Sequence, residues 1–212
     1  MPTPCASGTL SVYQSLGATG CTEGNFLFTD FTFGASAAGA GSILPVDTGI
    51  SVTPQSTASN AGFLFDAALS PATGQSQDVV IDYIVRAWTG GNIITDSALS
   101  VEASGSASAN MTECLGGLLP ACSGGKIIGL TANPNQLADL NTFAGVSTVS
   151  AGTDISASNG GNISGELVQF STGEGDPGGN SMAPEPASLL LFGTGVLGLA
   201  LLLRKKKVRL PF

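Results

Sequence analysis

The sequence lacks histidine altogether and has little charge: of 212 residues, 10% are charged and seven are Lys or Arg. Without an imidazole, Ser-His-Asp and Cys-His catalytic arrangements are excluded. The chain has a formal net charge of −8, and an acidic surface repels nucleic acid. We therefore expect no enzyme activity, no cofactor and no nucleic-acid partner; an extracellular enzyme is the least favoured alternative.

Cysteine is also scarce, and the four cysteines form two local pairs along the chain. Four cysteines allow three pairings, which sequence alone does not distinguish. Local pairing closes short loops, each worth about 3 kcal/mol in the loop-entropy model. A metal site is disfavoured, because the chain has neither Cys-x-x-Cys spacing nor histidine. We favour two disulfides formed in an oxidising compartment, Cys5–Cys21 and Cys114–Cys122, and no metal.

The cations are concentrated at the C-terminal end, directly after an uncharged apolar run at 187–203. At about 1.5 Å per residue a helix of this length spans roughly 25 Å, close to the ~30 Å hydrocarbon core of a bilayer. A buried core helix is the alternative, but such a helix rarely ends in five cations. The run therefore predicts a single transmembrane helix followed by a basic stop, Arg204, Lys205, Lys206, Lys207 and Arg209.

The distribution of charge predicts the orientation of this helix. Arg86 and Lys126 are the only cations ahead of the apolar run, where all 15 acidic residues also lie. Cytoplasmic segments carry the excess of Lys and Arg, so the basic tail stays in the cytoplasm. The preceding residues, which we call the ectodomain and its linker, are then placed outside the cytoplasm.

A short polar motif, Pro184-Glu185-Pro186, stands immediately before the apolar run. The order of motif, apolar helix and basic terminus at 184–212 resembles the PEP-CTERM sorting signal of Gram-negative bacteria, a segment also labelled an ice-binding-protein C-terminal domain. The resemblance implies recognition by an exosortase, a membrane-embedded transpeptidase, and processing near the motif. It also implies transient residence in the inner membrane, followed by display at the cell surface or in the exopolysaccharide matrix.

Export through this route predicts a signal peptide at the start of the chain. Met1 to Cys5 provides neither the basic nor the apolar part of such a peptide. We therefore expect that the natural precursor begins upstream of this start.

The ectodomain, residues 1–170, is predicted to be an all-β, antiparallel β-sandwich. Short apolar stretches with alternating residues are separated by Gly, Asn, Pro and Asp clusters, which is typical of eight to ten strands with turns between them. A Gly- and Ser-rich segment at 171–183 predicts a flexible linker. The predicted strands lie near 26–33, 50–52, 63–65, 78–86, 93–94, 99–101, 127–128, 146–149 and 163–170.

Three local features refine this prediction. Phe26 and Phe28 are out of phase with Phe31 and Phe33, which suggests a β-bulge near Asp30. Thr9 is a candidate cap for a short helix over 10–16. A second short helix is expected at 135–141.

The ectodomain offers few residues for ligand binding. Trp88 and Tyr83 are candidates for stacking on a sugar, although Trp88 is also expected at the core or rim. Asp78 and Asp82 share a strand face and are expected to be solvated rather than a tight pair. Calcium is the least implausible metal, through Asp47, Asp66, Asp96 or the loop 174–176, but none has EF-hand spacing. We expect a structural or adhesive surface protein, with a carbohydrate-binding module of the matrix as the alternative.

Overall fold

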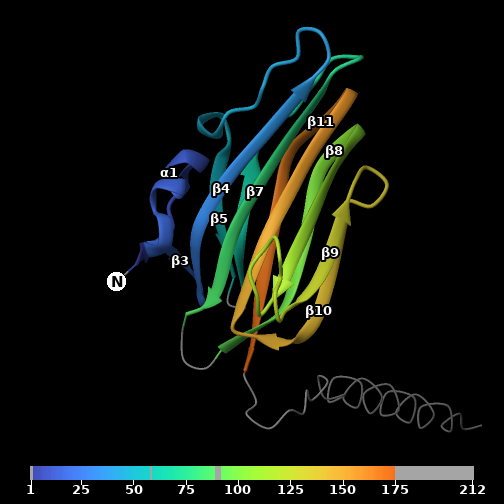
Figure 1. Cartoon of the computed structure of the whole chain (residues 1–212). Helices are drawn as coiled ribbons and strands as arrows, with labels where there is room; N and C mark the ends of the chain where they lie inside the picture. The colour runs from blue at the N-terminus through green and yellow to red at the C-terminus, as the bar shows by residue number, and fades with distance from the viewer. Residues whose placement is uncertain (1, 58, 89–91, 175–212) are drawn as a thin grey trace, which may run out of the picture. The chain divides into compact units, whose positions relative to one another are not determined.

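Most of the chain forms strands, as the alternation of apolar and polar residues predicts. The computed structural model describes residues 2–57, 59–88 and 92–174, and its 11 described strands belong to one hydrogen-bonded network (Figure 1). The strands are β1 (Thr3–Pro4), β2 (Gly8–Thr9), β3 (Cys21–Glu23), β4 (Phe26–Ala38), β5 (Ser51–Ser56), β6 (Asn60–Asp66), β7 (Ser76–Ala87), β8 (Asn92–Leu115), β9 (Lys126–Ala132), β10 (Ala138–Val146) and β11 (Thr148–Glu174).

The long strands β8 and β11 pair antiparallel along nearly their whole length and change partners midway. Their register shifts between Ser158 and Asn162, next to three residues with positive φ: Gly105, Asn159 and Gly160. Before this point β11 pairs with β7, through 148–158; after it, β11 pairs with β6, through 166–171. The network thereby divides into two layers that share these strands.

We name the two layers by their strands. Layer A has the order β1-β3-β4-β7, continued by 148–158 of β11, 106–115 of β8 and β9. Layer B has the order β2-β5-β6, continued by 162–174 of β11, 92–104 of β8 and β10. In Figure 1, β3 and α1 lie at one edge and β9 and β10 at the other. Among the described strands only the two-residue pair β1–β3 is parallel.

Aromatic rings from both layers meet in the core. Phe28 of β4 lies edge-on to Phe63 of β6, with ring centroids 4.6 Å apart. Tyr83 of β7 lies 6.0 Å from Phe65 of β6 and 6.3 Å from Phe170 of β11. All five side chains are almost completely buried. The layers therefore pack face to face, and the predicted β-sandwich is the architecture of the described chain.

The predicted bulge in β4 is confirmed. The register of β4 against β7 shifts between Thr29 and Thr32, and Asp30 adopts a φ of 57°. The extra residue returns Phe31 to the inward face that Phe28 already occupies. Three phenylalanines of one strand, at 26, 28 and 31, are thereby buried in the same core.

The first predicted helix is present and the second is not. Helix α1 (Leu10–Ser15) follows an extended Thr9, whose hydroxyl contacts Ser11 Oγ rather than capping the backbone. Short 3₁₀ turns at Gly17–Thr19 and Asp47–Gly49 accompany it. The helix expected at 135–141 is wrong: the chain turns at 133–136 and then forms β10, which pairs with β8. Tertiary strand pairing overrides the weak local preference there.

Two strand boundaries also differ from expectation. Two short strands were expected within 92–115, at 93–94 and 99–101, but the chain continues through Ser104 and Gly105 as one bent strand, β8. Strand β11 extends to Glu174, paired with Asn92, so 171–174 belong to the sandwich rather than to the expected linker. No helix among the described residues is long and apolar enough to span a membrane, and 187–203 lie outside them.

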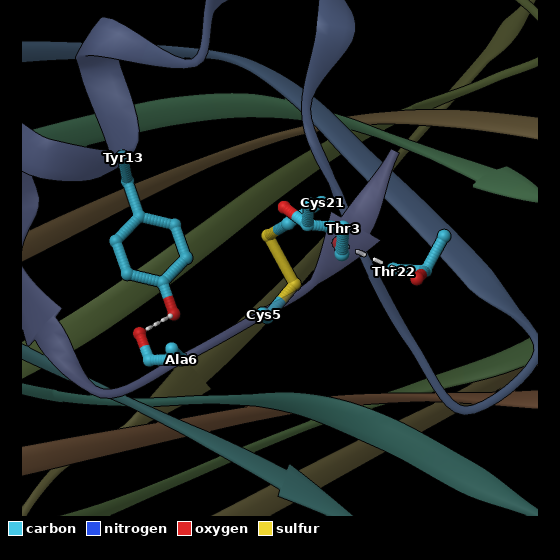
Figure 2. The surroundings of a disulfide bond; sticks show 6 residues. All are labelled: Thr3, Cys5, Ala6, Tyr13, Cys21 and Thr22. Carbon is cyan, nitrogen blue, oxygen red and sulfur yellow. Dashed lines mark hydrogen bonds between the residues drawn. A yellow bond between two sulfur atoms is a disulfide. The ribbon is translucent and has the colours of Figure 1, made fainter. Parts of the chain in front are cut away.

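Both disulfides form with the local pairing. Cys5 and Cys21 join the N-terminal segment to β3, with Cα atoms 4.9 Å apart (Figure 2). The Tyr13 hydroxyl donates a hydrogen bond to the Ala6 carbonyl at 2.9 Å and so ties α1 to the same segment. Cys114 and Cys122 close the loop after β8, with Cα atoms 5.4 Å apart.

The disulfide pairing predicts a simple peptide map. Non-reducing digestion should yield one cross-linked peptide containing Cys5 and Cys21 and another containing Cys114 and Cys122. Replacing both Cys5 and Cys21 with alanine should lower the free energy of unfolding by about 3 kcal/mol, because the unfolded chain loses its cross-link. Free thiols at all four positions, or cross-linked Cys5 and Cys114, would contradict the pairing.

The interlayer aromatic contact predicts a large cost for Phe63→Ala. Removing this ring leaves a cavity among Phe28, Tyr13 and Phe31, which should reduce the free energy of unfolding by about 3–5 kcal/mol. Urea unfolding followed by far-UV circular dichroism measures the change. Leu140→Ala on the exposed edge strand β10 is the control and should stay within about 0.5 kcal/mol of wild type.

Candidate functional site

The sequence-predicted sorting signal lies outside the described residues. This applies to the motif Pro184, Glu185 and Pro186 and to the basic stop at 204–209. The candidate site that the structure does describe is a surface groove on the sandwich.

The groove lies on the outer face of layer A and has a volume of about 570 Å³. Alternate residues of β7, β8 and β11 fill the core, so the residues between them face outward and form the floor. The loop between β8 and β9 supplies one wall. The floor residues include Asp82, Thr112, Ser150, Gly152 and Asp154, and the wall residues are Leu118, Leu119 and Pro120.

The wall is held in place by the second disulfide. Cys114–Cys122 links the end of β8 to the loop, and the Leu119 amide donates a hydrogen bond to Ser150 Oγ at 3.2 Å. Gly125 packs so closely on this disulfide that a Cβ there would lie 2.8 Å from Cys114 Sγ. The disulfide therefore determines where the apolar wall stands relative to the floor.

Carboxylates and hydroxyls line the floor. The Thr32 hydroxyl donates to Asp82 Oδ2 at 3.3 Å. Gly152 lies beside Asp82, where any Cβ would collide with Asp82 Oδ1, so glycine leaves space for this carboxylate. The groove thus combines hydrogen-bond acceptors with an apolar wall.

Asp154 at the groove edge shares a hydrogen bond with Asp78 on the neighbouring strand. Partial burial, this hydrogen bond and the charge of Asp78 together raise the pKa of Asp154 to about 6. Asp78 therefore interacts with Asp154 of β11, and not with Asp82 of its own strand, as a pair. Only the register of β7 against β11 brings these carboxyls together, because they lie 76 positions apart in the chain.

The two aromatic candidates for sugar stacking do not line the groove with an exposed ring. Tyr83 is 1% exposed in the core, so its proposed role as a surface sugar platform is wrong. Trp88 follows the end of β7, is 47% exposed, and its amide donates to the Asn25 carbonyl. Trp88 is a rim residue at the end of a strand, away from the groove lining.

The calcium candidates do not converge. In the part of the chain that the structure describes, no group of three or more His, Cys, Asp or Glu residues could hold a metal ion. Asp47 instead accepts a hydrogen bond from the Thr48 amide within its own turn. Asp66 and Asp96 lie on β6 and β8, and Asp176 lies outside the described residues.

Comparison with solved structures gives distant matches. TmCBM61, solved in complex with beta-1,4-galactotriose, is 10% identical with a TM-score of 0.35, over 64% of this chain and 86% of that chain. A carbohydrate-binding module of the β-sandwich superfamily is 9% identical with a TM-score of 0.31, over 82% and 61%. The enzymatically active domain of bacteriophage CBA120 tailspike protein 4 is 11% identical with a TM-score of 0.30, over 68% and 19%. At these scores the matches carry no argument about fold or ligand.

Sequence comparison is informative only at the C-terminal end. No curated protein matches the chain. Residues 183–206 match the family model of the PEP-CTERM protein-sorting motif, which covers Pro184-Glu185-Pro186, the apolar run and the first three cations of the basic stop. The predicted resemblance is confirmed: this chain carries a PEP-CTERM protein-sorting motif.

Proposed function

We propose that the chain is an exported protein that an exosortase recognises through 184–206, processes near Pro184-Glu185-Pro186 and releases to the cell surface or the extracellular matrix. The sorting motif is the observation that carries this proposal. Proline fixes its own φ and disfavours the helical region at the residue before it, so the motif sequence favours an extended form that a protease-like cleft can bind. The basic stop after the apolar run orients the ectodomain away from the cytoplasm.

The ectodomain serves a structural or adhesive role in this proposal rather than a catalytic one. The chain has no histidine, and its cysteines are bonded in pairs. A disulfide-bonded sandwich suits a protein that remains outside the cytoplasm, where thiols are oxidised.

Carbohydrate binding in the exopolysaccharide matrix is the second candidate, and the groove on layer A favours it. Asp82 and the neighbouring hydroxyl groups can accept hydrogen bonds from sugar hydroxyls, while Leu119 and Pro120 can cover an apolar sugar face. The surrounding acidic residues favour a neutral over an anionic polysaccharide.

The sorting proposal predicts that the tail alone directs processing. A secreted reporter fused to 171–212 should enter the envelope of an exosortase-containing host and then appear in a shortened form. Glu185→Ala should slow processing at least tenfold, because it removes the carboxylate of the motif. Pulse-chase immunoblotting measures the rate.

Glu174→Ala in the same fusion is the matched control, since it removes a carboxylate ahead of the motif. This variant should be processed at the wild-type rate. Equal processing of Glu185→Ala and wild type, or equal processing in a host without exosortase, would refute the sorting proposal.

The groove proposal predicts that filling the groove weakens polysaccharide binding. Thr112 is exposed on the floor, so Thr112→Trp should place an indole in the groove and weaken binding at least tenfold, about 1.4 kcal/mol. Affinity electrophoresis in gels containing neutral polysaccharides measures this. Thr142→Trp on β10 is the control, because Thr142 is exposed outside the groove.

A variant of Trp88 distinguishes binding in the groove from the alternative, in which a sugar stacks on the Trp88 ring. Trp88→Ala should leave binding unchanged if the groove is the site. Loss of binding with Trp88→Ala and retention with Thr112→Trp would move the site to the end of β7.

A further inference from the structure

Two glutamates lie inside the sandwich, where apolar residues are expected. Glu113 of β8 and Glu166 of β11 are both 0% exposed. Glu113 alternates with buried Met111 and Leu115, and Glu166 alternates with buried Val168. Both side chains therefore belong to the inward faces, Glu113 in layer A and Glu166 in layer B.

Glu113 connects the two layers directly. The Ser97 hydroxyl in layer B donates a hydrogen bond to Glu113 Oε2 in layer A at 2.6 Å, and both residues are fully buried. The two residues come from opposite halves of the bent strand β8. This hydrogen bond therefore joins strand β8 to itself across the core.

Tyr83 is associated with both glutamates. Ala151 of β11 pairs with Tyr83 on one side and with Glu113 on the other, so the three residues form one row across layer A. Glu166 in layer B pairs with Phe65, whose ring lies 6.0 Å from the ring of Tyr83. The charges of Glu166 and Glu113 both act on the Tyr83 hydroxyl, which places the three polar groups in one region of the core.

Most of the polar atoms in this region have no partner among the described residues. These atoms are Tyr83 Oη, Glu113 Oε1 and both carboxyl oxygens of Glu166. The cations of the described ranges do not offset them: Arg86 donates to Thr29 Oγ1 and Lys126 is exposed. A buried carboxylate without a counter-ion is costly, and protonation removes that cost.

The surroundings of each carboxyl favour its neutral form. Burial raises the pKa of Glu166 to about 8, with a smaller contribution from the charge of Asp154. Burial also raises the pKa of Glu113 to about 7, against the opposing effect of the Ser97 hydrogen bond. Burial, and then the two glutamates, raise the pKa of Tyr83. The neighbouring side chains that β4 and β6 pack against Tyr83 are phenylalanines.

We propose that Glu113 and Glu166 form a proton-dependent lock between the two layers, which holds the sandwich closed while both carboxyls are protonated and weakens as the surrounding pH rises. A protonated carboxyl carries no charge and can donate a hydrogen bond, whereas a carboxylate can only accept one. Ionisation removes these donors and leaves negative charge between the layers. The lock consists of buried core residues, and it rests neither on the sorting proposal nor on carbohydrate binding in the groove.

The pH range over which stability changes follows from the difference between the pKa values of the two glutamates in the folded chain and in the unfolded chain. A glutamate in an unfolded chain titrates near pH 4.3, whereas these two titrate near 7 and 8 in the fold. The stabilisation is complete below about pH 4.3 and declines as pH rises, because the native state then holds protons that the unfolded state has released. The decline ends near pH 7 for Glu113 and near pH 8 for Glu166.

Urea unfolding of the full chain in detergent micelles, followed by far-UV circular dichroism from pH 5 to 8, tests the lock. For each glutamate the unfolding equilibrium constant should rise about tenfold per pH unit within its range. Glu113→Gln/Glu166→Gln, in which neutral amides replace the acids, should fold and lose most of this pH dependence. Glu102→Gln, an exposed position of the same strand, should retain it. Asp154 is present in every variant, so its own contribution to the pH dependence, which ends near pH 6, should be the same in all of them.

A second measurement uses the wild-type chain alone. Its infrared spectrum at pH 6 should contain the carbonyl band of protonated carboxylic acids, and this band should lose intensity as pH rises through about 7 and 8, where Glu113 and Glu166 titrate. Wild-type stability that does not change from pH 5 to 8 would overturn the lock. Stabilisation by added calcium or sodium that both Gln substitutions abolish would also overturn it, since the glutamates would then be ionised ligands.

Discussion

The pairing of β8 with β11 is the constraint on which the rest of the sandwich depends. Each strand contributes one half to layer A and the other to layer B, so their common bend sets how the two layers face each other. The bend needs backbone conformations that Gly105 and Gly160 adopt at little cost. Once it forms, the aromatic side chains of β4, β6 and β7 pack against one another in the core between the layers.

The same pairing places the groove floor and the buried Glu113 on opposite faces of layer A. Thr112 and Asp154 point outward and form the groove floor, while Glu113 points inward. Because side chains alternate along a strand, a one-residue slip of β8 would expose the buried carboxyl and bury the groove residues. The hydrogen bond from Ser97 to Glu113 and the Cys114–Cys122 disulfide both oppose such a slip.

Sequence reasoning succeeded where the signal is local. Alternation predicted the strands, the phase change among the phenylalanines predicted the bulge at Asp30, and short spacing predicted the disulfides. The reasoning failed where a distant partner decides the conformation. The strand expected at 99–101 continues through Gly105 because β11 pairs with it, and 138–141 form a strand because β8 offers an open edge.

The candidate sites also differ in whether they depend on local sequence or on distant strand pairing. The sorting motif consists of consecutive residues, so its order can be recognised without a fold. The groove could not be predicted, because the partner of Asp78 is set by strand register and the apolar wall by a disulfide-closed loop. Tyr83 was misplaced for a related reason: a polar aromatic residue in an alternating strand can face either side, and here its ring completes the core.

The scarcity of cations affects both the charge of the surface and the protonation of the buried glutamates in this protein. Among the described residues Arg86 and Lys126 are the only cations against a large excess of acids. A buried glutamate in most proteins can be neutralised by Lys or Arg. Neither cation of the described ectodomain pairs with Glu113 or Glu166, so a proton is the neutralising partner that the core itself allows. The composition that makes the surface acidic therefore also makes the stability of the core depend on pH.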